Sequence, residues 1–155
     1  MGNYTDLESE FIERTIKLID QYTGLCEKFS FDEQYNYTLT INCLLGLIVM
    51  PKERVVSYIP TKRLTNAFKK EIGLIQSVIK PEIKTLRELI ESLRHAVAHF
   101  DINVVSENDS KLIDYIEFKD TEVDVVIASF RGNELFAFLQ YYSTCLLENL
   151  RRHQY

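Results

Sequence analysis

One segment of the chain, residues 81–100, constrains the fold most, because its apolar side chains recur with an unbroken helical spacing. Successive apolar residues are three or four positions apart, at Ile83, Leu86, Ile90, Leu93, Val97 and Phe100. This period places a continuous apolar stripe along one side of a helix, and such a stripe must be buried against other elements. Pro81 is favoured in the first turn of a helix, and Glu82 suits the helix dipole there. The sequence therefore predicts a long packed helix over residues 81–100.

The same type of pattern predicts further helices before and after this segment. Three of them are expected to follow the N-terminal caps Thr5, Asp32 and Asn133, and a short one is expected to start from Thr65. The first cap opens a capping box, because Glu8 stands three residues after Thr5. The first helix should end before Ser30, and the second should end at Met50, because Pro51 disfavours helical backbone in the residue that precedes it.

The pattern changes between residue 101 and the last helix. The segments 102–105, 112–118 and 123–130 are rich in β-branched and aromatic residues, and the first two are separated by the turn-forming residues 106–110. They predict two or three short antiparallel strands. The expected fold is thus mainly α: an up-and-down bundle of four to five helices in a single domain over residues 1–155, with a small antiparallel β insertion at about 102–130 before the last helix.

Charge and composition exclude some classes of protein. The net charge is −5, so the molecule as a whole should not attract nucleic acid, and any anion-binding surface must be local. The most apolar run, residues 39–50, is shorter than the roughly 20 residues of a membrane-spanning helix. The three cysteines, Cys26, Cys43 and Cys145, are far apart and lie in apolar helical patterns. They are typical of small buried residues in a reducing compartment, and we expect a cytoplasmic protein.

One local surface does have the charge that anion binding requires. The segment 51–70 carries six basic residues against one acid, a net charge of +5. The basic residues are Lys52, Arg54, Lys62, Arg63, Lys69 and Lys70. A basic loop can be a merely solvated surface or a binding site for phosphate groups, and the sequence leaves both interpretations open.

The segment 81–100 also carries the most reactive side chains. His95 and His99 are four residues apart, so they share one face of the helix, nearly opposite the apolar stripe, with Arg94 on the flank between the two faces. The pair can simply be a solvated polar surface. It can also bind a metal ion together with Glu91, which stands one turn earlier on the same face, as paired histidines on a helix bind zinc.

A third interpretation is phosphoryl-transfer chemistry without a metal. One imidazole can accept a proton from a ribose 2′-hydroxyl, another group can protonate the leaving 5′-oxygen, and an arginine can stabilise the charge on the phosphate. A complete site needs several such groups to converge. A two-fold dimer that apposes two copies of this helix would supply them.

Two segments carry a resemblance to a known family. Arg94-His95-Ala96-Val97-Ala98-His99 resembles the R-[polar]-x3-H signature of the HEPN (higher eukaryote and prokaryote nucleotide-binding) superfamily. The position of this motif near the C-terminal end of a long helix in a bundle also fits that family. The segment Asn42–Glu53 is similar to a plasmid-borne subfamily of HEPN ribonucleases.

The resemblance implies a metal-independent endoribonuclease that needs no cofactor and acts as a homodimer on RNA. It implies that His99 is the essential acid/base, that Arg94 orients or stabilises the scissile phosphate, and that His95 assists. The products would carry a 2′,3′-cyclic phosphate and a 5′-hydroxyl, in a toxin–antitoxin or anti-phage setting with a possible antitoxin protein as partner. The basic segment 52–70 would then follow the RNA backbone. The alternatives are a non-catalytic HEPN module that binds nucleotides or proteins, and a helical protein that binds metal through Glu91, His95 and His99.

Overall fold

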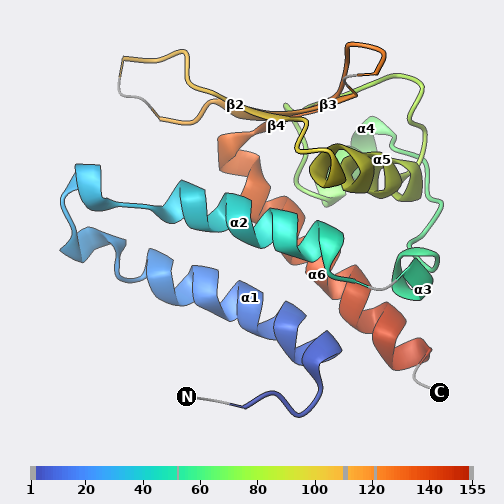
Figure 1. Ribbon diagram of the computed structural model, residues 1–155, viewed down its shortest axis with the longest axis horizontal. Helices are drawn as coiled ribbons and strands as arrows, with labels where there is room; N and C mark the ends of the chain where they lie inside the picture. The colour runs from blue at the N-terminus through green and yellow to red at the C-terminus, as the bar shows by residue number, and fades with distance from the viewer. Residues whose placement is uncertain (1–2, 52, 110–111, 121, 154–155) are drawn as a thin grey trace.

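The computed structural model of the chain describes residues 3–51, 53–109, 112–120 and 122–153 and contains α-helices and one small sheet (Figure 1). The α-helices are α1 (Leu7–Thr23), α2 (Asn36–Val49), α3 (Glu53–Val56), α4 (Asn66–Glu71), α5 (Leu86–Ala98) and α6 (Leu135–Arg152). Short 3₁₀ helices are η1 (Cys26–Lys28), η2 (Phe31–Glu33) and η3 (Gly132–Glu134). The strands are β1 (Val78–Ile79), β2 (Ile102–Val105), β3 (Tyr115–Asp120) and β4 (Val125–Arg131).

The helices pack into a layer that the sheet covers at one side. In Figure 1, α1 and α2 run antiparallel, and α6 crosses and contacts both of them. α5 lies between α2 and the sheet, because it contacts α2 as well as β3 and β4. Fully buried side chains from α2, α5, α6, β3 and β4 form the core, among them Leu44, Leu47, Leu89, Leu93, Phe118, Phe130 and Phe138. Each such side chain stabilises the fold by about 1.5–3 kcal/mol, so α5 is held firmly from two sides.

The sheet is larger than the expected insertion over residues 102–130. It has four antiparallel strands in the order β1-β4-β3-β2, and β1 precedes α5 in the chain. In β1, Val78 pairs with Ser129 and Ile79 pairs with Ala128 of β4. Two residues are too few to show the alternation that marks a strand in a sequence. The fold is therefore a mixed one, with predominant helices and a small antiparallel sheet, rather than a purely helical bundle with a β insertion.

The central helix α5 begins later than the sequence pattern predicts, at Leu86 rather than Pro81. Its N-cap is Thr85, whose hydroxyl accepts from the amide of Glu88 at 3.2 Å, while the Glu88 carboxylate accepts from the amide of Thr85 at 3.1 Å. This capping box satisfies amides that a helix leaves without partners at its first turn. Immediately upstream, the Lys80 amide donates to the Ile127 carbonyl at 2.9 Å, so this part of the chain is joined to the sheet instead.

α5 also ends earlier than expected. The amide of Phe100 donates to the Val97 carbonyl at 3.1 Å, and the amide of Asp101 donates to the Ala96 carbonyl at 2.8 Å. These two bonds form a Schellman motif, in which the residue after the C-cap adopts the left-handed conformation. Phe100 occupies that position, with φ of 59°. Its side chain is consequently not part of the buried stripe, as the spacing had predicted, and 80% of it is exposed.

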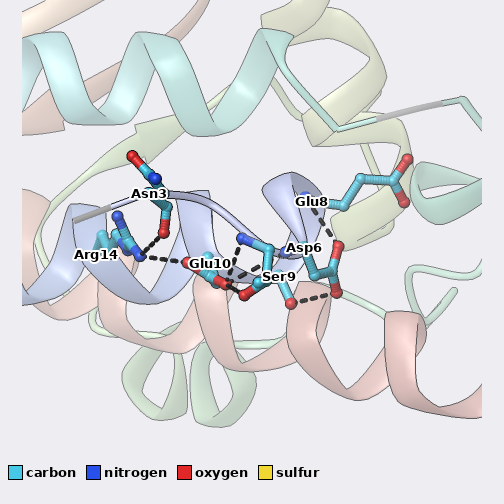
Figure 2. Close-up of polar contacts among 7 residues, drawn as sticks. Asn3, Asp6, Glu8, Ser9, Glu10 and Arg14 are labelled. Atoms are coloured by element: carbon cyan, nitrogen blue, oxygen red, sulfur yellow. Dashed lines mark hydrogen bonds and ion pairs between the residues drawn. The ribbon is translucent and has the colours of Figure 1, made fainter.

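The first helix starts with a dense polar cap (Figure 2). Asp6, rather than the expected Thr5, is the N-cap, and its carboxylate accepts from the Glu8 amide at 3.2 Å and from the Ser9 hydroxyl. The Glu10 carboxylate accepts from the amides of Thr5 and Asp6 at 3.0 and 3.2 Å. Arg14 pairs with Glu10 and donates to the Asn3 carbonyl at 2.9 Å, which ties the N-terminal segment to α1. 

The other predicted boundaries are partly confirmed. Thr65 caps α4, accepting from the Phe68 amide at 3.2 Å. α1 ends at Thr23, well before Ser30, because the chain then forms the separate 3₁₀ turns η1 and η2, and α2 starts at Asn36 rather than directly after Asp32. Asn133 lies within η3, so it does not cap α6. Across the described ranges, no helix combines the length and the apolar character that crossing a membrane requires.

Candidate active site

His95 on α5 and His99, the residue that directly follows α5, stand side by side on the solvent-facing surface of this helix. Both His95 and His99 are exposed, and their ring centroids are 4.4 Å apart with the planes tilted by 52°. The spacing of four residues produces this contact, because such positions are neighbours on a helix surface. The opposite side of α5 is buried through Leu86, Leu89, Ile90, Leu93 and Ala96. Two imidazoles are thus presented to solvent by a helix whose other face is anchored in the core.

Arg94 points to the neighbouring helix instead. Its Nη1 donates to the carbonyl of Ile48 at 2.7 Å and to that of Pro51 at 3.1 Å, with the Val49 carbonyl at 3.5 Å. The last carbonyls of a helix have no partner within the helix, and a cation at that end is favourable for the dipole. Arg94 therefore caps the C-terminus of α2 and fastens α5 to it.

The charge of Arg94 also reaches the buried interior. Tyr142 of α6 is fully buried, and its hydroxyl has no hydrogen-bond partner among the residues that the structure describes. Burial raises the pKa of Tyr142, while the positive charge of Arg94 acts in the opposite direction. The phenol is therefore neutral at ordinary pH. Arg94 is a permanent cation between the core and the surface that carries His95 and His99.

A depression of about 340 Å³ lies against His95. Its lining includes Lys80, Glu82, Glu88, Ser92 and Asp120, from the segment before α5, from α5 itself and from β3. The Ser92 hydroxyl donates to the Glu88 carbonyl at 2.8 Å within the helix. This depression brings carboxylates, an ammonium group and an imidazole together on one surface of the sheet–helix junction.

The metal-binding interpretation is not supported by the arrangement of side chains. In the portion of the chain described above, no three His, Cys, Asp or Glu side chains gather closely enough to hold a metal ion. Glu91 is exposed on α5 and does not complete a ligand set with His95 and His99.

Nucleophilic cysteine chemistry is not favoured either. Cys26, Cys43 and Cys145 are free thiols; Cys43 is buried, as expected, whereas the other two are only half-buried. Burial raises the pKa of the thiols of Cys43 and Cys145. Because the thiolate is the reactive form, these two residues are less reactive than an ordinary cysteine.

The basic residues of segment 51–70 are not all in equivalent positions. Lys62 pairs with Glu71 at 2.7 Å, and its Nζ lies 4.2 Å from the centre of the Phe68 ring. Lys70 is exposed on α4. Lys52 lies outside the described residues, and so does the side chain of Arg54. Of the six predicted residues, the structure brings Arg63 and Lys69 together, in a second depression next to the one beside His95.

Sequence reasoning missed two members of this second depression, Lys80 and Lys84. They stand in the segment before α5, outside the basic run of residues 51–70. No spacing rule connects them with Arg63, because the contact depends on main-chain pairing between residues that are distant in the chain, such as the bridge of Arg63 with Thr85. The signal in the sequence was that both are basic and stand close to Pro81.

Comparison with known proteins gives one result for the chain as a whole. The family model described as HEPN pEK499 p136 matches residues 1–153. No curated protein and no solved structure matches the chain. The family match extends over every element described above, including α5 and its histidines.

Proposed function

Because the chain belongs to the HEPN family described as HEPN pEK499 p136, we propose that it is a metal-independent endoribonuclease whose chemistry is performed by the end of α5. Endoribonuclease activity is frequent in HEPN proteins. The observation that carries the proposal is the exposed pair of imidazoles, His95 and His99, with ring centroids 4.4 Å apart. The pair stands on a helix held rigidly by the core, as a catalytic constellation must be.

The reaction that suits these groups is transesterification of RNA. The 2′-oxygen forms a bond to phosphorus while the bond from phosphorus to the 5′-oxygen breaks, leaving a 2′,3′-cyclic phosphate and a 5′-hydroxyl. His99, as the histidine of the family motif, exchanges a proton with the reacting oxygens, and His95 assists in binding or in the second proton transfer. One group must accept the 2′-hydroxyl proton, and another must deliver a proton to the 5′-oxygen.

Arg94 has a double role in this proposal. Within one chain it positions the motif, because its Nη1 binds the carbonyls at the end of α2. Its positive charge, close to the two imidazoles along the same helix, favours a phosphate at their surface. Because its Nη1 binds these carbonyls, that nitrogen does not bind the scissile phosphate at the same time, and a second copy of the chain can supply further electrostatic support.

We propose that the working form is a homodimer with two motifs at one composite site. Exposed apolar side chains at the two helix ends that Arg94 joins support this: Phe100, the second residue after α5, and Val49 and Met50 at the end of α2. Exposed apolar side chains of this kind are favourable when a partner covers them. A two-fold axis through this surface would bring the histidines of both chains to one cleft.

The test is RNA cleavage by the purified protein in the presence of EDTA, with His99→Ala as the decisive variant. His153→Ala is the matched control, because His153 lies at the end of α6 and stacks on Tyr58 with a centroid distance of 3.4 Å. The proposal predicts EDTA-resistant cleavage with 2′,3′-cyclic phosphate ends, abolished by His99→Ala and kept in the control. Cleavage that requires a metal would instead support the Glu91, His95 and His99 metal site.

A second candidate function is a non-catalytic HEPN module that binds a nucleotide or a protein. It is favoured by the commitment of Arg94 to the main chain of α2. Wild-type protein that cleaves no RNA of a mixed pool, in the absence of any copurified inhibitor, would support this alternative. For the nuclease, we propose a toxin or anti-phage role in the cytoplasm with an antitoxin protein as partner; growth arrest on expression that His99→Ala relieves is the expected result.

A further inference from the structure

A basic depression lies beside the proposed active site. It has a volume of about 410 Å³ and is lined by four cationic side chains, Arg63, Lys69, Lys80 and Lys84, and among the residues that the structure describes no acidic one belongs to this lining. The chain as a whole has a net charge of −5, so this concentration of positive charge is exceptional for the molecule. A concave surface of one sign of charge attracts ligands of the opposite sign.

The main chain fixes the four cations relative to one another. Segment 62–65 pairs with the segment that leads into α5: the Leu64 amide donates to the Lys84 carbonyl at 2.8 Å, and the Leu86 amide donates to the Lys62 carbonyl at 3.3 Å. The Lys80 amide is bound to β4 through the Ile127 carbonyl at 2.9 Å. The depression is thus built on paired backbone, which preorganises its charges for binding.

For two of the lysines, Lys69 and Lys84, the side-chain partner leaves the positive charge uncompensated. The Nζ of Lys69 donates to the Ser77 carbonyl at 2.7 Å, and the Nζ of Lys84 donates to the Pro81 carbonyl. Carbonyl groups orient an ammonium group but do not neutralise it. Lys62 just outside the depression shows the contrast, since it is paired with the carboxylate of Glu71 at 2.7 Å. The ligand that completes this site therefore has to be an anion.

The depression continues toward the histidines. Lys80 and Ile83 line both this basic depression and the one against His95. The depression against His95 is lined by the carboxylates of Glu82, Glu88 and Asp120 as well as by Lys80, so it is the basic depression that requires an anion. Single-stranded RNA supplies one through its backbone phosphates, and binding of these phosphates supplies affinity that is independent of sequence.

We propose that Arg63, Lys69, Lys80 and Lys84 form a subsite for a backbone phosphate of single-stranded RNA, next to the phosphate that is cleaved at His95 and His99. This assignment rests on the proposed ribonuclease function. The guanidinium group of Arg63 binds two phosphate oxygens through its planar donor fork, and the ammonium groups act as point charges. The subsite contacts the phosphate backbone of the RNA. An RNA long enough to reach it therefore binds more tightly than a shorter one.

Binding is measured without cleavage by fluorescence anisotropy of a labelled 2′-fluoro oligouridylate of 12 nucleotides, which keeps the phosphates but has no attacking 2′-hydroxyl. The test variant is Arg63→Gln/Lys84→Gln, since both side chains are exposed at the depression. The matched control is Lys17→Gln/Lys28→Gln, which removes two exposed charges from α1 and η1, away from α4 and α5 (Figure 1). Melting curves of both variants verify that they fold.

We expect the test variant to bind about tenfold more weakly at about 0.1 M salt. Its plot of log affinity against log salt should be shallower by about 0.7, the value of one lost phosphate contact on a single strand. The control variant should bind as the wild type does. Equal affinity and salt slope in the wild type and the test variant would overturn the subsite, as would wild-type protein that does not bind this oligonucleotide.

A second measurement separates this subsite from the catalytic proposal. A dinucleoside monophosphate contains only the scissile phosphate, so Arg63→Gln/Lys84→Gln should cleave it at the wild-type rate while KM for a 12-nucleotide RNA rises about tenfold. Inorganic phosphate should compete with the oligonucleotide for the wild type. If the protein binds RNA through these residues but cleaves no substrate, the ribonuclease proposal fails and the phosphate site stands; if both substrates are affected equally, the subsite assignment is wrong.

Discussion

Replacement of Arg94 by alanine should destabilise the fold, independently of any effect on catalysis. The side chain is half-buried between α5 and α2, and its Nη1 lies 2.7 Å from the Ile48 carbonyl and 3.1 Å from the Pro51 carbonyl. These carbonyls lie at the C-terminal end of α2, where no further helical turn supplies an amide. The substitution removes the donor of these hydrogen bonds. Because the site is half-buried, water can replace the lost donor only in part.

The expected loss can be worked out from these contacts. A hydrogen bond from a charged donor contributes about 1.5–3 kcal/mol, and two such bonds from one nitrogen, partly screened by solvent, contribute about 2–3 kcal/mol together. Arg94→Lys keeps a cation at the end of α2, an effect of about 0.3–1 kcal/mol, and can restore one of the two bonds. Arg94→Lys should therefore lower the free energy of unfolding by about 1 kcal/mol.

The assay is urea unfolding followed by far-ultraviolet circular dichroism. With a slope of about 2 kcal/mol per molar urea, Arg94→Ala should lower the midpoint by about 1 M and Arg94→Lys by about half of that. Glu91→Ala is the control on the same helix; it is exposed and should change the free energy of unfolding by less than about 0.5 kcal/mol. A midpoint of Arg94→Ala that coincides with that of Glu91→Ala would refute the capping role. Cleavage assays at a temperature where Arg94→Ala is folded then isolate any catalytic contribution.

Three further predictions follow from single contacts. Glu134→Gln should lower the free energy of unfolding by about 3 kcal/mol in the same urea assay. The buried Glu134 carboxylate accepts from the three amides of residues 75–77 at 2.8–3.0 Å, and the side-chain amide of glutamine would turn a donor toward some of them. A loss below about 1 kcal/mol would contradict this. Phe100→Gly should be more stable than Phe100→Ala by about 1 kcal/mol in thermal melts, since φ of 59° is costly for any residue with a Cβ atom, and equal stabilities would show that the end of α5 relaxes. Hydrogen bonds from Thr5 lower the pKa of Glu10 from 4.5 to about 2, so this carboxylate stabilises the fold above pH 4.5 and its contribution is lost as the pH falls toward 2. The melting temperatures of the wild type and Glu10→Gln should therefore differ at pH 6 and coincide near pH 2. A difference that does not change with pH would exclude this role.

Features that depend on near neighbours in the chain were predictable. The outward placement of His95 and His99 follows from the period of the apolar residues on α5, and the structure has both residues exposed. The start of a short helix at Thr65 and the β-forming character of segments 102–105, 112–118 and 123–130 follow equally from local chemistry. Each of these depends on backbone geometry within a few residues, and a sequence pattern reflects such geometry directly.

Errors occurred where one local preference competed with a distant partner or with another local motif. Pro81 and Glu82 are good residues for a helix start, yet the backbone at Lys80 pairs with β4, and the helix begins only after the capping box at Thr85. Phe100 continues the apolar spacing, yet the Schellman turn rotates it outward. β1 is defined only by its pairing with β4 and has no pattern of its own.

The amino-acid sequence by itself determined the helix that carries Arg94, His95 and His99, and the residues of the family motif on it. Only the tertiary structure decided that Arg94 binds the end of α2, and that Lys80 and Lys84 join Arg63 and Lys69 in one basic depression. The physical reason is that helical periodicity is a property of residues three and four positions apart. Convergence of charges depends instead on strand pairing and helix packing between segments that are distant in the chain.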